Sequence, residues 1–336
     1  MTNLLYIGNK LVSEKTNITS IDTLGTLLSD EGYNVKYASD KKNTVIRLLH
    51  MFYTIMINRR SVDYVLIDTY STLNFYYAFF VSQICRLCNL KYIPILHGGN
   101  LPNRIERSPV KSKMIFDNAH RNVSPSIYIK ENFEKKGYRN IEFIPNTLEI
   151  DKYPYKRREK VDAKLLWVRS FKAIYNPLMA VRVAKRLLDS KITTSLCMVG
   201  PFGDDTFALA KDLAQNLNVE VNFTGKLSQE DWIELSRNYD VFINTSDYDN
   251  MPVSLIEAMA LGLPVITTNV GGIPSLVKDG ENAILINPND HNAMAMAIGQ
   301  LNQDPEKVQK LSRNGRINAE NFDWNVVKEK WNSLLK

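Results

Sequence analysis

The chain has 336 residues, of which 44% are hydrophobic and 23% are charged. That balance excludes a mainly disordered chain, because it offers enough apolar surface to offset the entropy lost on folding. The 15 Gly and 13 Pro do not recur with a period, which excludes a collagen-like or low-complexity chain. The net charge of +6 is compatible with anionic partners in general, and the length suggests two domains of about 150 residues each.

Short apolar runs alternate with segments of helical period along the first half of the chain. After the first run, apolar residues recur at helical spacing from Ile21 to Leu28. Thr19 or Ser20 is suited to cap the start of this helix, and Gly32 is suited to end it. The apolar runs predict strands at residues 4–8, 34–38, 63–68, 91–96, 122–124 and 141–144.

The second half of the chain repeats this scheme, with helices predicted at residues 177–189 and 229–238 among others. The strands predicted there are residues 164–168, 195–199, 219–223, 240–244, 264–267 and 283–286. Strands that alternate with helices predict an α/β fold with parallel sheets and helices on both faces. We therefore expect two Rossmann-like, doubly wound domains.

The break between these domains is predicted in a polar stretch at residues 149–161, which contains Pro154 and a run of charged residues. This places an N-terminal domain at 1–150 and a C-terminal domain at 151–321. In open α/β sheets, ligands bind outside the carboxyl ends of the strands. Two such domains facing a deep cleft would form a typical ligand site, so the organisation by itself favours an enzyme.

The common nucleotide-binding signatures are absent from the sequence. Gly8 after the first strand is followed by Asn9 and Lys10 rather than by G-x-G-x-x-G, and no P-loop motif is present. Both absences count against a dehydrogenase or a P-loop NTPase.

The segment from Asn244 to Gly262 is the most informative one. A strand is predicted to end at Asn244, and a polar loop leads to a helix that begins near Pro252. Free N–H groups at such a helix start can hold an anion. Asp249 and Glu257 lie before and within this helix, where their carboxylates can accept hydrogen bonds from hydroxyls of a sugar and a ribose.

Asp249 and Glu257, with Ala-Met-Ala-Leu-Gly-Leu-Pro-Val-Ile after them, resemble the E-x(7)-E signature of retaining GT-B glycosyltransferases of glycosyltransferase family 4, also called glycosyl transferases group 1. The first acid is Asp here, where the family usually has Glu. Further segments similar to the family are Ile144-Pro145-Asn146, Leu165-Leu166-Trp167-Val168-Arg169, Met198-Val199-Gly200-Pro201, Phe223-Thr224-Gly225-Lys226 and Phe322-Asp323-Trp324. The match is specific in the C-terminal half and weak in the N-terminal half.

The resemblance implies a GT-B fold and a retaining, hexosyltransferase-type enzyme. It would move a sugar from a nucleoside diphosphate sugar, with UDP preferred over GDP, to an acceptor hydroxyl in bacterial surface polysaccharide or glycolipid assembly. Residues 151–321 would bind this donor and residues 1–150 the acceptor. A last helix at about 322–336 would pack back on the N-terminal domain.

The resemblance also implies roles for residues of the C-terminal domain. Glu257 would hold the ribose, Asp249 would contact the transferred sugar, and Arg169 would neutralise the diphosphate. Asp249 and Arg169 would thereby take part in catalysis. The other expected donor-binding residues are Lys172, Gly200, Lys226, Leu227, Met251, Pro252 and Val253, of which Met251 and Val253 would contribute backbone N–H groups.

In the N-terminal domain, the resemblance places His97, in the turn Leu96-His97-Gly98-Gly99-Asn100, near the reacting sugar. His97 is thus expected to be catalytic. The acceptor-side loop is expected to contain Gly98 together with Lys15, Thr16 and Asn17, which stand where the family has a Gly-Gly turn.

No cofactor and no metal are expected. Asp247-Tyr248-Asp249 matches a D-x-D metal motif, but that motif belongs to a different glycosyltransferase fold, and here Arg169 and a helix N-terminus can supply positive charge. Cys85 and Cys88 form a C-x-x-C in an apolar stretch without a second pair, which favours core thiols over a zinc or redox site.

A membrane-facing surface is a further hypothesis. Ile46, Leu49, Phe52, Tyr53 and Met56 can form one helix face flanked by Arg47, Arg59 and Arg60, and residues 75–80 add aromatic side chains. Burial in the N-terminal domain explains both segments equally well. No run of about 18 apolar residues and no basic leader are present, so we expect a cytoplasmic protein, with contact at the inner membrane face left open.

Two other functions are alternatives to transfer. A nucleotide-sugar epimerase or hydrolase can use the same two-domain scaffold, and it would act without an acceptor. Nucleic acid is not expected as a partner, because the basic residues are scattered rather than arranged in a stripe. The expected partners are thus a nucleotide-sugar donor and a saccharide or lipid-linked acceptor.

Overall fold

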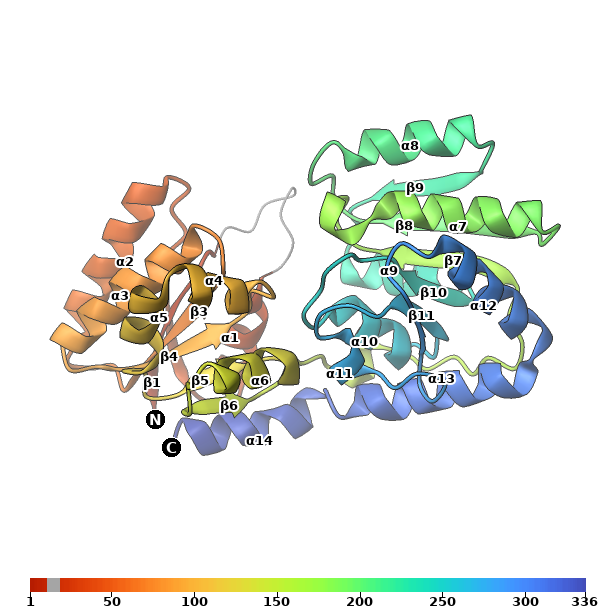
Figure 1. Ribbon diagram of the computed structural model, residues 1–336. Helices are drawn as coiled ribbons and strands as arrows, with labels where there is room; N and C mark the ends of the chain where they lie inside the picture. The colour runs from red at the N-terminus through yellow and green to blue at the C-terminus, as the bar shows by residue number, and fades with distance from the viewer. Residues whose placement is uncertain (11–18) are drawn as a thin grey trace. The chain divides into compact units, whose positions relative to one another are not determined.

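The computed structural model of the chain describes residues 1–10 and 19–336. The chain divides into two compact units, unit 1 (Met1–Asn146 and Val327–Lys336) and unit 2 (Thr147–Val326). Each unit contains a six-stranded sheet whose paired strands are parallel, with helices on both of its faces (Figure 1). The predicted α/β class with two doubly wound, Rossmann-like domains is confirmed.

The sheet of unit 1 has the strand order β2-β1-β3-β4-β5-β6. Its strands are β1 (Asn3–Ile7), β2 (Asn34–Ala38), β3 (Tyr64–Thr69), β4 (Lys91–Leu96), β5 (Asn122–Ser124) and β6 (Ile141–Phe143). Its helices are α1 (Ser20–Asp30), α2 (Thr44–Asn58), α3 (Asn74–Leu87), α4 (Leu101–Arg107), α5 (Pro109–Phe116) and α6 (Ile127–Lys135).

Local sequence explains these elements well. All six residues of β3 are buried, as expected for a parallel strand covered on both faces. Helix α1 begins at a capping box, in which Asp22 accepts hydrogen bonds from the backbone N–H and hydroxyl of Thr19 at 3.1 and 2.7 Å. Gly32 follows its end at φ +93°, a conformation that favours glycine. The cap and stop predicted from sequence are therefore confirmed.

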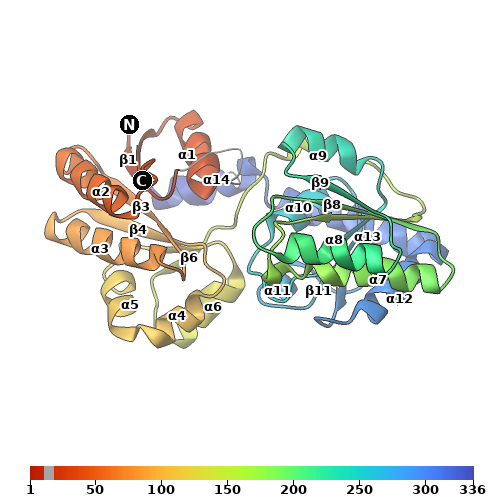
Figure 2. The same ribbon diagram turned by 90° about the horizontal axis from the view of Figure 1, so that it is seen from above.

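The last helix, α14 (Trp324–Leu334), begins in unit 2 and ends in unit 1. Within unit 1 it lies beside α1 (Figure 2), where Lys328 pairs with Glu31 at 3.0 Å. The hydroxyl of Tyr33 donates to Asn332 Oδ1 at 2.9 Å. These two contacts join α14 to the segment at and just after the end of α1, although the paired residues lie almost 300 positions apart in the sequence.

The sheet of unit 2 has the strand order β12-β11-β10-β7-β8-β9. Its strands are β7 (Ala163–Val168), β8 (Thr194–Val199), β9 (Val221–Gly225), β10 (Val241–Asn244), β11 (Val265–Thr268) and β12 (Ile284–Ile286). Its helical elements are η1 (Ile150–Lys152), η2 (Ala173–Tyr175), α7 (Pro177–Asp189), α8 (Thr206–Asn216), α9 (Gln229–Ser236), α10 (Val253–Ala260), α11 (Ile273–Leu276), α12 (His291–Gln303) and α13 (Pro305–Glu320). Helices α7, α8 and α12 pack on one face, and α9, α10 and α11 pack on the other.

One predicted strand starts two residues later than expected. Val219 does not open β9 but follows α8 and closes its C-terminus, because its N–H donates to the carbonyl of Ala214 at 2.9 Å. Asn218 lies between them at φ +51°, which is typical of a helix C-terminus closed by a left-handed residue. The apolar run in the sequence therefore combines a helix stop with a strand start.

The strand orders locate one switch point in each sheet. In unit 1, β1 and β3 are neighbours although β2 follows β1 in the chain, and in unit 2, β7 neighbours β10. Chain connections leave in opposite directions on the two sides of such a point, so the carboxyl edge there is open to a ligand. We therefore expect ligand sites at the loops that follow β1, β3, β7 and β10.

Candidate functional site

Arg169 follows β7 at the switch point of unit 2. Its guanidinium forms an ion pair with the carboxylate of Asp249, and the two side chains are only 16% and 11% exposed. The guanidinium also lies 4.5 Å from the centre of the Tyr175 ring. Burial lowers the pKa of Arg169, and the nearby Tyr175 and Glu257 oppose this shift. Arg169 is thus a partly dehydrated cation, which strengthens its attraction for an anion.

Asp249 lies in the loop between β10 and α10, and two glycines hold that loop. Gly272 donates its N–H to the Asp249 carbonyl at 3.0 Å. Gly271 has a φ of +54°, and a Cβ added there would collide with the same carbonyl oxygen. Only glycine therefore allows the two segments to approach so closely. The Asp249 carboxylate itself accepts the Asn250 N–H at 2.9 Å.

The N-terminus of α10 comes next in the chain. Pro252 is its N-cap residue and Val253 its first helical residue, and both Met251 and Pro252 are buried. The N-cap residue Pro252 makes no side-chain hydrogen bond to this helix start. Its first N–H groups are therefore available to an anion, and the helix dipole favours negative charge at this end.

Glu257 lies on α10. Its Oε1 accepts a hydrogen bond from the Tyr153 hydroxyl at 2.5 Å, and that hydroxyl in turn accepts one from Gln229 Nε2. Burial raises the pKa of Glu257, while the Tyr153 hydrogen bond and the positive charge of Arg169 oppose the rise. Arg169 therefore interacts electrostatically with Glu257 as well as with Asp249, so the structure brings these three predicted residues together.

The remaining donor-side residues expected from sequence surround this group to different degrees. Gly200 follows β8, donates its N–H to the Gly225 carbonyl at 2.8 Å, and leaves no room for a Cβ against the Arg169 carbonyl. Lys226 and Leu227 follow β9, with Leu227 packed on the core. Lys172 is exposed on the loop after β7, where its side chain lies against Gly203.

Three residues of this site were missed by sequence reasoning. Tyr153 falls in the polar stretch predicted as the break between the domains, Gln229 only begins a predicted helix, and no predicted site includes Tyr175. Tyr153 is 104 positions from Glu257, so no local pattern reports their contact. The one signal in the sequence was an aromatic residue within a segment predicted to be polar. In the structure the Tyr153 side chain is buried, with 1% of it exposed.

His97 occupies the carboxyl edge of unit 1, directly after β4. Its Nε2 lies 2.8 Å from Asp68 Oδ1, and its Nδ1 lies 3.4 Å from the Ser20 hydroxyl. Gly98 follows, and a Cβ there would lie 2.7 Å from the Ser71 backbone nitrogen. Lys15, Thr16 and Asn17, expected in the acceptor-side loop, lie outside the described residues.

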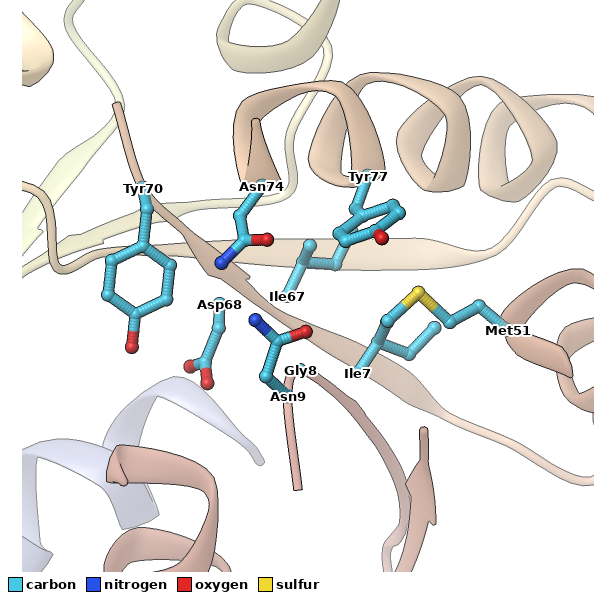
Figure 3. A pocket seen from close by; sticks show the side chains of 9 residues that line it. All are labelled: Ile7, Gly8, Asn9, Met51, Ile67, Asp68, Tyr70, Asn74 and Tyr77. Carbon is cyan, nitrogen blue, oxygen red and sulfur yellow. The ribbon is translucent and has the colours of Figure 1, made fainter. Parts of the chain in front are cut away.

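A small cavity lies at the switch point of unit 1, between the ends of β1 and β3. It measures about 10 Å³ and is lined in part by Gly8, Asn9, Asp68, Tyr70 and Asn74 (Figure 3). That volume is close to the minimum for a single water molecule. The cavity therefore marks a polar gap beside Asp68 rather than a complete substrate site.

No group of three or more His, Cys, Asp or Glu side chains suited to a metal ion occurs within residues 1–10 and 19–336. The two acids of the D-x-D motif have separate partners, since Asp247 accepts from Asn176 Nδ2 at 3.0 Å whereas Asp249 pairs with Arg169. The expectation of a metal-free and cofactor-free site stays a prediction. In the same described part of the chain, no helix is long and apolar enough to cross a membrane.

A family model, described as glycosyl transferases group 1, matches residues 151–318. This covers half of the chain and includes Arg169, Asp249 and Glu257. The chain belongs to the glycosyl transferases group 1 family. Its fold is that of GT-B glycosyltransferases, as the resemblance implied.

Curated relatives of this group 1 chain include a glycogen synthase from Mycobacterium tuberculosis, 24% identical over 194 residues, which are 57% of this chain and 47% of the relative. Another is a UDP-Gal:alpha-D-GlcNAc-diphosphoundecaprenol alpha-1,3-galactosyltransferase from Escherichia coli, 26% identical over 203 residues, which are 56% and 51% of the two chains. The chain thus spans about half the length of the curated relatives it matches.

Solved structures match the group 1 chain over nearly its full length. The sucrose-phosphate synthase from Thermosynechococcus elongatus has a TM-score of 0.81 at 16% identity, covering 99% of this chain and 98% of that one. HepE from Anabaena, in complex with UDP-glucose, has a TM-score of 0.80 at 16% identity, covering 99% of both chains. At this identity the likeness establishes the fold, which agrees with the two sheets described above.

Proposed function

We propose that this protein is a retaining glycosyltransferase of family 4 that transfers a hexose from a nucleoside diphosphate sugar to an acceptor hydroxyl. The observation that carries the proposal is the convergence of Arg169, Asp249 and Glu257 beside the uncapped N-terminus of α10. One cationic group, a free helix start and two carboxylates match the needs of a diphosphate flanked by two polyols.

The proposed roles follow from the charges. Glu257 accepts hydrogen bonds from the ribose, Asp249 from hydroxyls of the transferred sugar, and Arg169 binds the diphosphate together with N–H groups at Met251 and Val253. We assign Gly200, Lys226 and Leu227 to the nucleotide pocket by their positions at the ends of β8 and β9. Lys172 and Pro252 belong to the loops that frame this site.

In the proposed reaction, the bond between the sugar's anomeric carbon and the β-phosphate oxygen breaks, and the acceptor oxygen bonds to the same face of that carbon. The acceptor proton passes to the leaving β-phosphate. Arg169 and the α10 N–H groups would stabilise the negative charge that grows there, and one such contact is worth about 10²- to 10³-fold in rate. We also assign His97 to the contact with the reacting sugar.

The donor and acceptor classes are supported by the relatives rather than by this chain alone. HepE is described in complex with UDP-glucose, and the Escherichia coli relative is named for UDP-Gal, which is why we favour UDP over GDP. The epimerase or hydrolase alternative gains no support from the relatives named above. No metal or cofactor enters the proposal.

We propose a lipid-linked or saccharide acceptor and contact with a membrane surface through α2. Helix α2 exposes a row of large apolar side chains: Val45, Ile46, Leu49, Tyr53, Met56 and Ile57, each at least 44% exposed. Lys41 and Lys42 precede this face, and Arg59 and Arg60 follow it, all exposed. Apolar side chains between basic residues suit an anionic lipid surface.

Three residues of that hypothesis need correction. Phe75, expected among the aromatic side chains of residues 75–80, is buried in the core of unit 1. Arg47, expected to flank the apolar face, is buried, because its guanidinium donates to the Lys41 and Lys42 carbonyls and to Asn9 Oδ1 at 2.7–2.9 Å. Phe52 is half-buried against the core of unit 1. The remaining side chains still support a role in surface polysaccharide or glycolipid assembly, with the protein in the cytoplasm at the inner membrane face.

Thermal unfolding with UDP, GDP, ADP and CMP, each with and without EDTA, tests the donor site. A ligand at about 100 times its dissociation constant stabilises the fold by about 2.7 kcal/mol. We expect UDP to raise Tm most, equally with and without EDTA, and Glu257→Ala to abolish the rise. Glu234→Ala, which alters an exposed acid of α9, is the matched control and should retain the rise. The absence of a shift with every nucleotide would contradict the proposal.

Product analysis then tests the reaction itself. The purified chain is incubated with UDP-glucose and with a lipid-linked acceptor, and the anomeric configuration of the product is read by NMR. A product with the donor's configuration supports retention, and the inverted configuration contradicts it. Free sugar or an epimer formed without acceptor would favour the hydrolase or epimerase alternative.

A further inference from the structure

Asp68 and His97 meet at the carboxyl edge of the first sheet because of strand register. Strands β3 and β4 are parallel neighbours, with Thr69 paired to Leu96. Asp68 lies one residue before this pair and His97 one residue after it, so both side chains emerge at the same edge. Their side chains are 2% and 8% exposed, which removes both from bulk water.

The Asp68 carboxylate is held as a hydrogen-bond acceptor. Its Oδ1 accepts the Tyr6 hydroxyl at 2.9 Å and lies 2.8 Å from His97 Nε2. Burial and the neighbouring carboxylate raise the pKa of Tyr6, so the hydroxyl keeps its proton and donates a hydrogen bond. A buried carboxylate is costly unless such donors satisfy it.

This arrangement determines where the proton of His97 resides. Since Asp68 Oδ1 accepts, Nε2 must carry a hydrogen, and in the neutral ring Nδ1 is then left with its lone pair. Ser20 lies at 3.4 Å from Nδ1, too long for a strong hydrogen bond. Within residues 1–10 and 19–336, Nδ1 is therefore the atom of His97 that can still take a hydrogen bond from a ligand.

Other contacts keep the dyad in place. The His97 N–H donates to the Thr69 carbonyl at 3.0 Å, and its ring lies 5.4 Å from that of Tyr70. Gly8 makes room for the carboxylate, since a Cβ there would lie 2.5 Å from Asp68 Oδ2. The same carboxylate borders the small cavity at the switch point (Figure 3).

We infer that Asp68 is a positioning residue for the proposed transferase: it holds His97 in the Nε2–H tautomer, so that Nδ1 accepts a hydrogen bond from a saccharide hydroxyl. Asp68 itself does not touch the substrate. The inference rests on the proposed function for the saccharide, whereas the tautomer is a property of the chain alone. The two parts can therefore fail separately.

The tautomer is read directly by ¹⁵N NMR of the imidazole nitrogens in the full chain, at a pH above the range where histidine titrates. The chain has four His, and His97→Gln identifies the signals of His97. We expect a protonated Nε2 and an unprotonated Nδ1. A protonated Nδ1, alone or together with Nε2, overturns the inference, whether or not the chain transfers sugar.

Variants of the dyad supply the second test. In Asp68→Ala the fixed tautomer should be lost, and kcat should fall about 10- to 100-fold. The KM for UDP-glucose should change less, because the contacts that we propose for the nucleotide and the diphosphate are in unit 2. Asp68→Asn preserves the shape of the side chain and an accepting oxygen, so its kcat should fall less. Because this variant should fold as the wild type does, it is the control for misfolding of Asp68→Ala. An unchanged His97 spectrum in Asp68→Ala overturns the inference. So does a decrease of kcat in Asp68→Asn as large as that in Asp68→Ala.

Tyr6→Phe is the matched control for packing. It removes the other hydrogen bond to the same Asp68 oxygen without touching the imidazole, so the tautomer and kcat should stay close to wild type. Equal losses in Tyr6→Phe and Asp68→Ala would mean that the cluster acts through stability alone. Retention of the UDP-induced Tm rise in Asp68→Ala shows that the donor site is intact, which separates this result from failure of the proposed function.

Discussion

The hydroxyl of Tyr153 donates a hydrogen bond to Oε1 of Glu257 over 2.5 Å, across 104 positions of sequence. Tyr153 lies just after η1, at the start of unit 2, and Glu257 lies on α10. Among the hydrogen bonds of the described residues, this one engages Oε1 only, so Oε2 is the carboxylate oxygen that we expect to receive a ligand. Tyr153 therefore fixes the orientation of the acid that we assign to the ribose.

Tyr153→Phe should weaken UDP binding. The change deletes a hydrogen bond to a buried carboxylate, which is typically worth about 1.5–3 kcal/mol, or roughly 10- to 100-fold in Kd. Isothermal calorimetry with UDP measures the effect. Tyr155→Phe is the control, since the Tyr155 hydroxyl contacts Ser312 at 3.3 Å instead, and it should bind UDP as the wild type does. Equal affinity in both variants would exclude Tyr153 from the donor site.

The stability of the fold should depend on pH through Glu257. Burial raises its pKa in the folded chain, so the folded chain retains a proton at pH values where the unfolded chain has released it. The free energy of unfolding then falls as pH rises from the unfolded-state pKa through the folded one. Glu257→Gln removes this pH-dependent decrease in the free energy of unfolding, and its amide oxygen can still accept the hydrogen bond from Tyr153.

We therefore expect Glu257→Gln and wild type to have similar Tm values at about pH 4 and the variant to be the more stable one at about pH 7. Thermal unfolding across this range measures the difference. A difference in Tm that stays constant with pH would show that the folded-state pKa of Glu257 is not raised.

Arg169→Ala should reduce kcat with UDP-glucose by about 10²- to 10³-fold, because it removes the cation that we place at the leaving phosphate. Arg169→Lys should recover only part of this, since an ammonium lacks the planar fork of guanidinium donors. Steady-state kinetics provide the readout. Arg237→Ala, at an exposed residue paired with Glu234, should leave kcat unchanged. Full activity of Arg169→Ala would remove Arg169 from the proposed mechanism.

A comparison of two glycines with positive φ distinguishes the cost of backbone strain from the cost of a steric collision. Gly271 and Gly280 have φ of +54° and +67°, but a Cβ meets the Asp249 carbonyl only at Gly271 and open space at Gly280. Gly280→Ala should cost about 1 kcal/mol. Gly271→Ala should cost more and should also abolish the UDP-induced Tm rise, because it displaces the loop of Asp249. Thermal unfolding with and without UDP compares the two, and equal behaviour would contradict this account.

The α2 surface should bind anionic vesicles. Replacing Leu49 and Tyr53 together by Ser removes two exposed apolar side chains and should reduce co-sedimentation with phosphatidylglycerol vesicles, with little change in Tm. The matched control is Met296→Ser with Ile317→Ser, which alters two exposed apolar residues of unit 2. Binding that survives in the α2 variant, or equal binding to neutral phosphatidylcholine vesicles, would contradict a basic-apolar membrane face.

Local sequence predicted the strands because each needs only a short apolar run between turn-forming residues. The bounds of β2, β4 and β5 agree with the prediction to the residue. Val219 shows the limit of this reasoning, since an apolar residue serves a helix end as well as a strand. The spacing of Asp249 and Glu257 is likewise a local property, and it was sufficient to locate the loop and helix of unit 2.

The sequence by itself therefore determined the α/β class, the order of elements and the motif around α10, because these depend on periodicity and on residues close together in the chain. Only the tertiary structure decided which side chains meet. Tyr153 reaches Glu257 and Asp68 reaches His97 through strand order and packing. Arg47 is buried because carbonyls before α2 accept hydrogen bonds from its guanidinium. Contacts between distant residues follow from the fold as a whole, and no local pattern encodes them.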